Sequence, residues 1–442
     1  MKDSTKEGVT KISVSEAMNQ AQRIHQEGHL DEARSIYQQI LLALPDYPDA
    51  LHYLGLACYQ SGESQEALTH IRAALEMAPE YYEACNNLGI ITQGLGQFAE
   101  AEACYRKVIK MQPGHANSHN NLGVVLKSQG RMQEAVEAYQ EALNLDNSHS
   151  QAHHNLGNLY RRVGQTAEAV MHFRAAIDCG LDTSEARHAL VNALYMNGEH
   201  EDARRILDEW QVHEPDSPIV QHLLAALHDA PTPSRASDDY VRIVFDGMAP
   251  NFDEHLGGLE YRAHKLVVQA LVDAVGPESK GLSVLDAGCG TGLCGPLVRP
   301  LATTLIGIDL SPKMLHRARV TQAYDDLIEV ELTGYIQKAN DAFDAIICAD
   351  TLCYFGDLEE VTQAVGQALR PGGRFVFTVE DWVDEKSPGY QISFNGRYNH
   401  GRAYVQQALT QAGLQVEALV LKALRQEIGE DVNGLVITAL RP

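Results

Sequence analysis

The stretch VLDAGCGTG at residues 284–292 has the composition of a turn that binds a ligand. An apolar run leads into it, and Gly288, Gly290 and Gly292 then allow the backbone to turn tightly and pass close to a ligand. We expect the N–H groups at the start of the following helix to face an anion. Asp286 is expected to serve an ammonium group of the same ligand, directly or through water.

Two more acidic residues end later apolar runs. Asp309 ends IGID, 19 residues after Gly290, a spacing at which a carboxylate accepts both hydroxyls of a ribose. Glu331 and Leu332 end the third run and would lie beside an adenine ring, with Met314 on its other face. The residues predicted to bind this ligand are Asp286, Ala287, Gly288, Cys289, Gly290, Gly292, Asp309, Leu310, Met314, Glu331, Leu332 and Asp350, the last of which follows the fourth run.

The elements that must position these residues alternate along the chain. From about residue 282, the apolar runs LSVLDA, TLIGID, LIEVEL, DAIICA and RFVFTV are separated by helix-like stretches, which is typical of a parallel sheet covered on both faces. VEALVLKAL and GLVITAL are separated only by the loop-like RQEIGEDVN, which predicts a terminal antiparallel hairpin. Together they predict an α/β Rossmann-like sheet of seven strands.

The string Gly290-x-Gly292-x-x-Gly295 also fits the GxGxxG pattern of nucleotide-dependent dehydrogenases. The acidic strand ends, LRPGGRF before the fifth strand and the terminal hairpin favour another class. Residues 238–442 resemble a class I methyltransferase that uses S-adenosylmethionine, and specifically bacterial methyltransferases with N-terminal TPR repeats. The resemblance implies methyl transfer and the cofactor residues named above, with Glu331 where Asp is usual. A cofactor-sensing fold without turnover and a dehydrogenase are the alternatives.

Methyl transfer depends mainly on alignment, and a general base is needed only for acceptors such as a hydroxyl, a phenol or a protonated amine. Tyr354 follows the fourth strand in CYFGDL, and the segments NGRYNHGRAYV and RQEIGE resemble the same TPR-bearing family. His400 is a candidate base near neutral pH, or a cap of the helix that follows. The candidates on the acceptor side, with the catalytic role expected of the first four, are Tyr354, Arg397, Tyr398, His400, Tyr404 and Arg425.

The charged and aromatic candidates each have a second interpretation. Arg397 or Arg425 would hold an acceptor carboxylate by a two-point contact, or would pair with Glu427 or another local acid. Phe245 and Phe252, in FDGMAPNFDEHL, resemble the aromatic covers of a helical lid, and the alternative is ordinary packing.

The N-terminal half repeats every 34 residues, the period of TPR arrays. In each repeat a glycine and an alanine let paired helices approach closely, and a bulky residue four positions after the alanine fills the space between them. This pattern predicts an all-α TPR solenoid over 14–228 with about six repeats and a terminal helix, a linker at 229–237 (DAPTPSRAS) and the methyltransferase domain at 238–442. The repeated columns are Leu54-Gly55, Leu88-Gly89, Leu122-Gly123 and Leu156-Gly157; Gly62, Gly96, Gly130 and Gly164; Ala67, Ala101, Ala135 and Ala169; and Ile71, Tyr105, Tyr139 and Phe173.

Asn87, Asn121 and Asn155 occupy one repeat column, immediately before Leu-Gly. An amide both donates and accepts, so such a ladder would hold the backbone of a protein or peptide partner. The NNLG and HNLG phrases resemble the TPR arm of O-linked N-acetylglucosamine transferases. The alternative is hydrogen bonding between neighbouring helices. Repeat packing also explains His119 and His153 better than a metal site, and we expect no metal.

Composition limits the remaining classes of function. The chain of 442 residues carries a formal charge of −24, which argues against nucleic acid as the main partner. The acidity serves solubility, or alternatively attracts basic partners. We expect a cytoplasmic protein, because the polar start lacks a signal sequence and no apolar stretch approaches the roughly 18 residues of a membrane span. The eight cysteines contain no CxxC pair and are expected to be reduced. The methyl acceptor would be a protein delivered by the solenoid or a small molecule.

Overall fold

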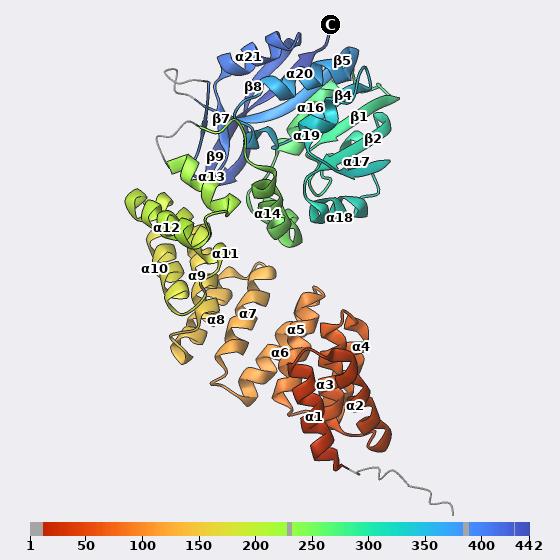
Figure 1. The fold of residues 1–442 in the computed structure, drawn as a ribbon, viewed down its shortest axis with the longest axis vertical. Coiled ribbons are helices and arrows are strands. Elements are labelled where there is room, and N and C mark those ends of the chain that lie inside the picture. Colours follow the sequence, from red (N-terminus) through yellow and green to blue (C-terminus); the bar gives the residue numbers. More distant parts are fainter. Residues whose placement is uncertain (1–11, 228–231, 383–388, 428) are drawn as a thin grey trace, which may run out of the picture. The chain divides into compact units, whose positions relative to one another are not determined.

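The computed structural model describes residues 12–227, 232–382, 389–427 and 429–442. The chain forms two compact units, Met1–Ala193 (unit 1) and Leu194–Pro442 (unit 2) (Figure 1). The predicted linker at 229–237 lies partly outside the described residues. Within the described ranges, no helix combines the length and the apolar character that a membrane crossing requires.

Unit 1 consists of antiparallel helix pairs, as the repeat predicts. Each pair begins with a helix of 13 residues, and a short turn leads to the second helix. The helices are α1 (Val14–Gln26), α2 (Leu30–Ala43), α3 (Pro48–Gln60), α4 (Ser64–Met77), α5 (Tyr82–Gly94), α6 (Phe98–Met111), α7 (Ala116–Ser128), α8 (Met132–Leu145), α9 (Ser150–Arg162) and α10 (Thr166–Asp178), followed by α11 (Ser184–Met196), in which the chain passes into unit 2.

The repeated columns are explained by contacts between the two helices of a pair. A Cβ atom added at Gly123 would lie 2.6 Å from Cε1 of Tyr139, and one at Gly89 would lie 2.7 Å from Cε1 of Tyr105. The glycine of the first helix therefore receives the aromatic ring of the second, with no space for any side chain. At the turn, Gly130 has φ +79°, a conformation that glycine adopts without strain. The predicted packing of the solenoid is confirmed.

Unit 2 begins with two repeat-type helices, α12 (His200–His213) and α13 (Pro218–Leu227). A helical segment before the sheet follows, made of α14 (Asp238–Met248), η1 (Ala249–Asn251), α15 (Phe252–Gly258) and α16 (Ala263–Val275). The remaining elements are β1 (Leu282–Ala287), α17 (Gly295–Val298), β2 (Ala302–Asp309), α18 (Pro312–Val320), β3 (Asp326–Glu329), α19 (Leu332–Ile336), β4 (Phe343–Cys348), η2 (Leu352–Tyr354), α20 (Glu359–Ala368), β5 (Leu369–Asp381), β6 (Tyr390–Ile392), β7 (Tyr398–His400), α21 (Arg402–Gln411), β8 (Gln415–Glu427) and β9 (Glu430–Leu440).

The sheet of unit 2 has the parallel order β3-β2-β1-β4-β5, and β9 then pairs antiparallel with both β5 and β8. The predicted seven strands are all present in the described residues, and the β6–β7 hairpin is added at the end of β5. Both faces are covered, since Leu285 packs in the cluster that includes α20 and α21, whereas Val284 packs in the cluster that includes α16 and α17.

Two details differ from the sequence-based prediction. The third strand ends at Glu329, so Glu331 is not a strand residue; its side chain instead caps α19. Most of the segment expected to be a loop in the terminal hairpin is strand, because β8 continues to Glu427 and β9 starts at Glu430. Arg425 therefore lies in a strand and is held firmly by its neighbours.

Candidate functional site

Asp286 lies at the carboxyl end of β1, opposite Gly307 of β2 and Ile347 of β4. This register brings the ends of three strands together, which is where ligands of such sheets bind. The carboxylate is 1% exposed and accepts a hydrogen bond of 2.6 Å from the hydroxyl of Tyr324. Burial raises the pKa of Asp286 to about 7. A cation beside this carboxylate would favour its ionised form.

The three glycines of the following turn have different environments. A Cβ atom at Gly288 would lie 2.8 Å from Cβ of Thr351, and one at Gly292 would lie 3.1 Å from the ring of Tyr324. Around a Cβ atom at Gly290, the described residues place no atom within 4 Å. Two of the glycines are thus required by the packing of the protein itself, and only Gly290 faces open space that a ligand can fill.

Asp309, at the end of β2, is half-buried and fixed by the backbone. Its two carboxylate oxygens accept N–H groups of Gly290 at 2.9 Å and Ser311 at 2.8 Å. The N–H groups of Gly288 and Cys289 both donate to the carbonyl of Ile308. These N–H groups are used within the protein, and α17 is only four residues long. The expected anion site at the start of that helix therefore does not form from these donors.

The other predicted cofactor residues surround this edge. Glu331 accepts N–H groups of Thr333 and Gly334 and pairs with Arg235 at 2.9 Å. Met314 is fully buried and Leu332 is 7% exposed. The side chains of Ala287 and Cys289 are buried, and that of Leu310 is half-buried.

The helical segment that precedes the sheet is attached to this edge by two acids. Asp246 of α14 accepts the hydroxyl proton of Ser311 at 2.5 Å. Asp253 of α15 accepts hydrogen bonds from Thr291 and Arg317, both at 2.6 Å. The loop after β1 and the loop and helix after β2 are thereby tied to this helical segment. The sequence pattern of this segment indicated a role for its phenylalanines but none for its acids.

Buried ion pairs link the arginines that were predicted to lie on the acceptor side. Arg397 donates to Glu380 at 2.5 Å, to Tyr354 at 3.3 Å and to Asp350. Arg425 donates to the same Glu380 at 2.8 Å. Asp350, which was expected to contact cofactor, instead has its carboxylate engaged by Arg397, and its φ of +57° is unusual for a non-glycine residue. Pairing with local acids is thus what both arginines do in this structure.

Aromatic rings connect Tyr354, a predicted acceptor-side residue, to the helical segment before the sheet. The ring of Phe245 lies edge-on to that of Tyr354, with centroids 5.3 Å apart, and Phe252 lies 6.0 Å from Phe245. Burial raises the pKa of the Tyr354 hydroxyl well above its usual value. The helical segment before the sheet and the residues after β4 therefore share one aromatic cluster.

The structure does not support a base role for His400. The side chain is fully buried in β7, its Nε2 hydrogen-bonds the carbonyl of Gly356 at 3.1 Å, and burial lowers its pKa to about 4. An imidazole enclosed in this way does not face an acceptor. Tyr398 is also fully buried, and Tyr404 donates to Asp357 at 3.0 Å.

The asparagines of the repeat column hydrogen-bond within unit 1: Asn87 and Asn155 bond to neighbouring helices, and Asn121 bonds within α7. Asn87 hydrogen-bonds His52 at 2.8 Å, Asn155 donates to Asn120 at 2.9 Å, and Asn120 donates to Asn121 at 3.3 Å. Each of these amides thus uses one of its polar groups in a hydrogen bond within the solenoid. His153 lies 3.1 Å from the carbonyl of Asn147 and His119 lies 3.2 Å from that of Pro113, the same offset in two repeats.

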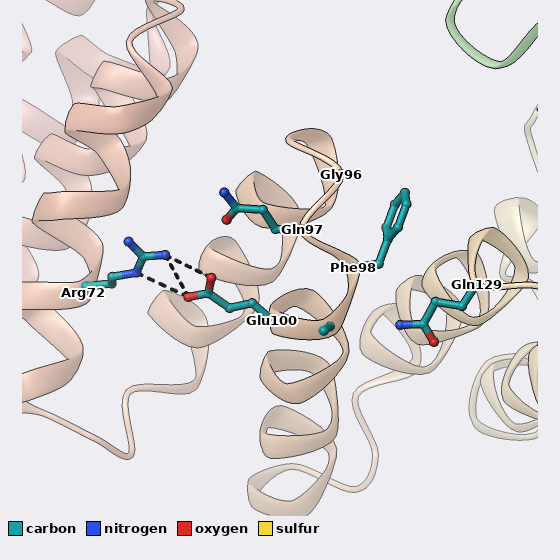
Figure 2. Close-up of a pocket in the computed structure, with 7 residues that line it drawn as sticks. Arg72, Gly96, Gln97, Phe98, Glu100 and Gln129 are labelled. Carbon is teal, nitrogen blue, oxygen red and sulfur yellow. Dashed lines mark hydrogen bonds and ion pairs between the residues drawn. The ribbon is translucent and has the colours of Figure 1, made fainter.

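Unit 1 also contains a hollow of about 660 Å³ at the turn between α5 and α6, where Arg72 pairs with Glu100 beside Phe98 (Figure 2). It is lined by Arg72, Gly96, Gln97, Phe98, Ala99, Glu100 and Gln129. Elsewhere in unit 1, potential metal-ligand atoms of Cys58, Glu66 and His70 lie within 4.8 Å of one another. The guanidinium of Arg34 lies 3.8 Å from Glu66, a position that disfavours a cation.

Comparisons with known proteins agree with this architecture. Residues 1–216 match the family model described as the cilia and flagella-associated protein 70 C-terminal domain, of TPR type, and residues 259–419 match a methyltransferase domain. A malonyl-[acyl-carrier protein] O-methyltransferase of Enterobacter lignolyticus is 30% identical, over 31% of this chain and 52% of its own length. Human methyltransferase-like protein 27 is 33% identical, over 30% of this chain and 55% of its own length.

A ubiquinone biosynthesis O-methyltransferase of Thiobacillus denitrificans is 26% identical, over 36% of this chain and 78% of its length. The first two relatives are thus matched over about half of their length. The two family models match different parts of the chain. The first covers the TPR columns of the solenoid, and the second covers the glycine turn of the sheet and its acidic strand ends. The chain therefore joins a TPR solenoid to a methyltransferase domain.

Proposed function

We propose that unit 2 binds S-adenosylmethionine at the ends of β1 and β2 and transfers its methyl group to an acceptor beside Arg397. The observation that carries the proposal is the environment of Asp286, a buried carboxylate close to the open space at Gly290. A ligand with an ammonium and a sulfonium group fits this position, because a buried carboxylate is stabilised in its charged form by a cation. When bound, the cofactor supplies a methyl group on positively charged sulfur.

Residues of this chain hold and enclose the ligand. Asp309 uses one lone pair of each oxygen on the backbone and keeps others for ribose hydroxyls. Tyr324 orients Asp286 through its hydroxyl. Asp246 and Asp253 fix the lid over the loops, which excludes water from the reaction and maintains alignment.

For the acceptor, the O-methyltransferase relatives favour oxygen as the methylated atom. A carboxylate acceptor requires no base, which is consistent with the enclosed position of His400. Among the described residues, Nη1 of Arg425 is a buried donor without a hydrogen-bond partner, 3.8 Å from Asp350. Such a donor suits an anionic acceptor.

For unit 1, we assign the binding of a protein or peptide partner. The amides of Asn87, Asn121 and Asn155 are half-buried and retain hydrogen-bonding groups beyond those used in the bonds within the solenoid. The partner is either the methyl acceptor or a regulator.

The test is incubation of the full-length protein with methyl-labelled S-adenosylmethionine and cell extract, followed by separation of macromolecules from small metabolites. Label in protein that decreases in an Asn121→Ala variant indicates recruitment by the solenoid. Label in small metabolites in both the wild type and the Asn121→Ala variant indicates that unit 1 has a separate role. Cofactor binding by calorimetry with no labelled product would instead support a sensor without turnover.

A further inference from the structure

The β6–β7 hairpin turns at residues 393–397, and two aromatic side chains of repeat-type helices hold this turn. His222 of α13 donates from Nε2 to the carbonyl of Gly396 at 2.8 Å. Tyr195 stacks on Phe394, with ring centroids 4.0 Å apart and planes 15° apart. All four residues belong to unit 2.

The contact between His222 and Gly396 is buried among the described residues. His222 is 5% exposed, and its ring lies 4.0 Å from that of Tyr240, which is itself 2% exposed. Gly396 has φ +78°, and an added Cβ atom would lie 3.2 Å from Cδ2 of His222 and closer still to the hydroxyl of Tyr240. The turn therefore fits tightly against α13 and α14. Its carbonyl would lack a donor if the imidazole were removed.

The turn leads directly into the acceptor side, because the residue after Gly396 is Arg397. Within the turn, the N–H group of Ser393 donates to the carbonyl of Arg397 at 2.7 Å, and the N–H group of Arg397 donates to Asn395 at 3.0 Å. The Arg397 guanidinium then reaches Glu380 and Asp350. A shift of the turn would move this guanidinium, since the backbone of Arg397 is part of the turn.

We infer that His222 is a positioning residue for methyl transfer: it fixes the 393–397 turn and thereby sets Arg397 against Glu380 and Asp350. The inference rests on the proposed function, in which Arg397 borders the acceptor. It also gives α13 a role beyond the coverage of the last repeat, because this helix supports the acceptor side of unit 2. A deletion of residues 1–228 would remove that support together with the solenoid.

The test compares five full-length variants with the wild type, four single substitutions and one double substitution. His222→Leu keeps bulk and removes the donor, and His222→Gln restores an N–H donor at similar reach. His213→Leu, on the exposed end of α12, is the matched control. Arg397→Ala, alone and combined with His222→Leu, shows whether His222 acts through Arg397.

The readouts are the binding of S-adenosylmethionine by calorimetry, the rate of label transfer at saturating cofactor over a dilution series of extract, and hydrogen exchange of the amides in residues 389–400. We expect His222→Leu to bind cofactor normally, to need about tenfold more acceptor for half-maximal transfer and to exchange faster in the turn. His222→Gln should remain within about threefold of the wild type. In the Arg397→Ala background, His222→Leu should add little.

Wild-type rates and exchange in His222→Leu would overturn the inference, as would additive effects of His222→Leu and Arg397→Ala. A wild type that transfers no label would instead show that the proposed function is wrong. In that case the exchange of the turn alone decides whether His222 positions it.

Discussion

Alanine at Gly290 and alanine at Gly288 should have opposite consequences. Both glycines have positive φ, +54° and +76°, so each substitution costs about 1–2 kcal/mol of backbone strain. At Gly290 the added methyl group enters open space, and stability should fall by no more than this strain. At Gly288 the methyl group meets the branched side chain of Thr351, which adds about 1–3 kcal/mol of overpacking. Gly288→Ala should therefore cost about 2–5 kcal/mol.

Binding should follow the reverse order. The methyl group of Gly290→Ala occupies the space assigned to S-adenosylmethionine, and the affinity should fall at least about tenfold, equivalent to about 1.4 kcal/mol. In Gly288→Ala, the molecules that remain folded should bind the cofactor better than Gly290→Ala does. Calorimetric titration at a temperature where both variants are folded measures this difference.

The stability of unit 2 can be followed separately, because the only two tryptophans of the chain, Trp210 and Trp382, both lie in it. Their fluorescence during urea unfolding reports the free energy of this unit, because unit 1 contains no tryptophan. Thr351→Ala should recover part of the loss in Gly288→Ala, since it removes two of the three contacting atoms. Wild-type affinity in Gly290→Ala, or equal stability of the two alanine variants, would refute the distinction between the glycines.

Three further predictions concern pH and packing. Burial raises the pKa of Asp286 from 3.8 to about 7, so its contribution to stability is present below pH 3.8 and is lost as the pH rises through about 7. Asp286→Asn should remove this pH dependence of the unfolding free energy measured by fluorescence. The affinity of the wild type for S-adenosylmethionine should increase between about pH 6 and 8, because the carboxylate ionises over this range. Because the pKa of His400 is lowered to about 4, His400→Gln should leave the shape of the transfer-rate profile over the same range unchanged. Gly123→Ala should lower the unfolding free energy of the solenoid by about 1–3 kcal/mol, because the ring of Tyr139 occupies the space of the added methyl group. Gly114→Ala is the control, since the described residues place no atom within 4 Å of its Cβ position, and it should leave the stability unchanged. Unfolding followed by circular dichroism measures both.

The solenoid could be predicted from the sequence because its contacts are local and repeated. Gly123 and Tyr139 are 16 residues apart, and a glycine followed 16 residues later by a bulky residue recurs in three other repeats, so the repeat pattern itself predicts the contact. The position of Asp286 was predictable for a related reason, since the carboxyl ends of parallel strands meet at one edge whatever the lengths of the helices between them.

The partners of these residues could not be predicted, because no local pattern connects them. Tyr324 reaches Asp286 across 38 residues, Asp246 reaches Ser311 across 65, and Arg235 reaches Glu331 across 96. Burial is equally hidden: the sequence around His400 is polar, NGRYNHGR, and yet its imidazole is fully enclosed. The sequence offered His400 as a candidate base or a helix cap, and the enclosure that argues against the base role is visible only in the structure.

Tyr324 also explains why the GxGxxG string does not indicate a dinucleotide site. In such sites the last two glycines allow close approach to a pyrophosphate and close packing of a long helix whose N-terminus binds it. Here a Cβ atom at Gly295 would lie 2.6 Å from the ring of Tyr324, one at Gly292 would lie 3.1 Å from it, and one at Gly307 of the neighbouring strand 2.9 Å. These glycines receive an aromatic ring of the protein, whose hydroxyl then holds Asp286. The spacing arises from packing around Tyr324, and the following helix of four residues is too short to serve a pyrophosphate.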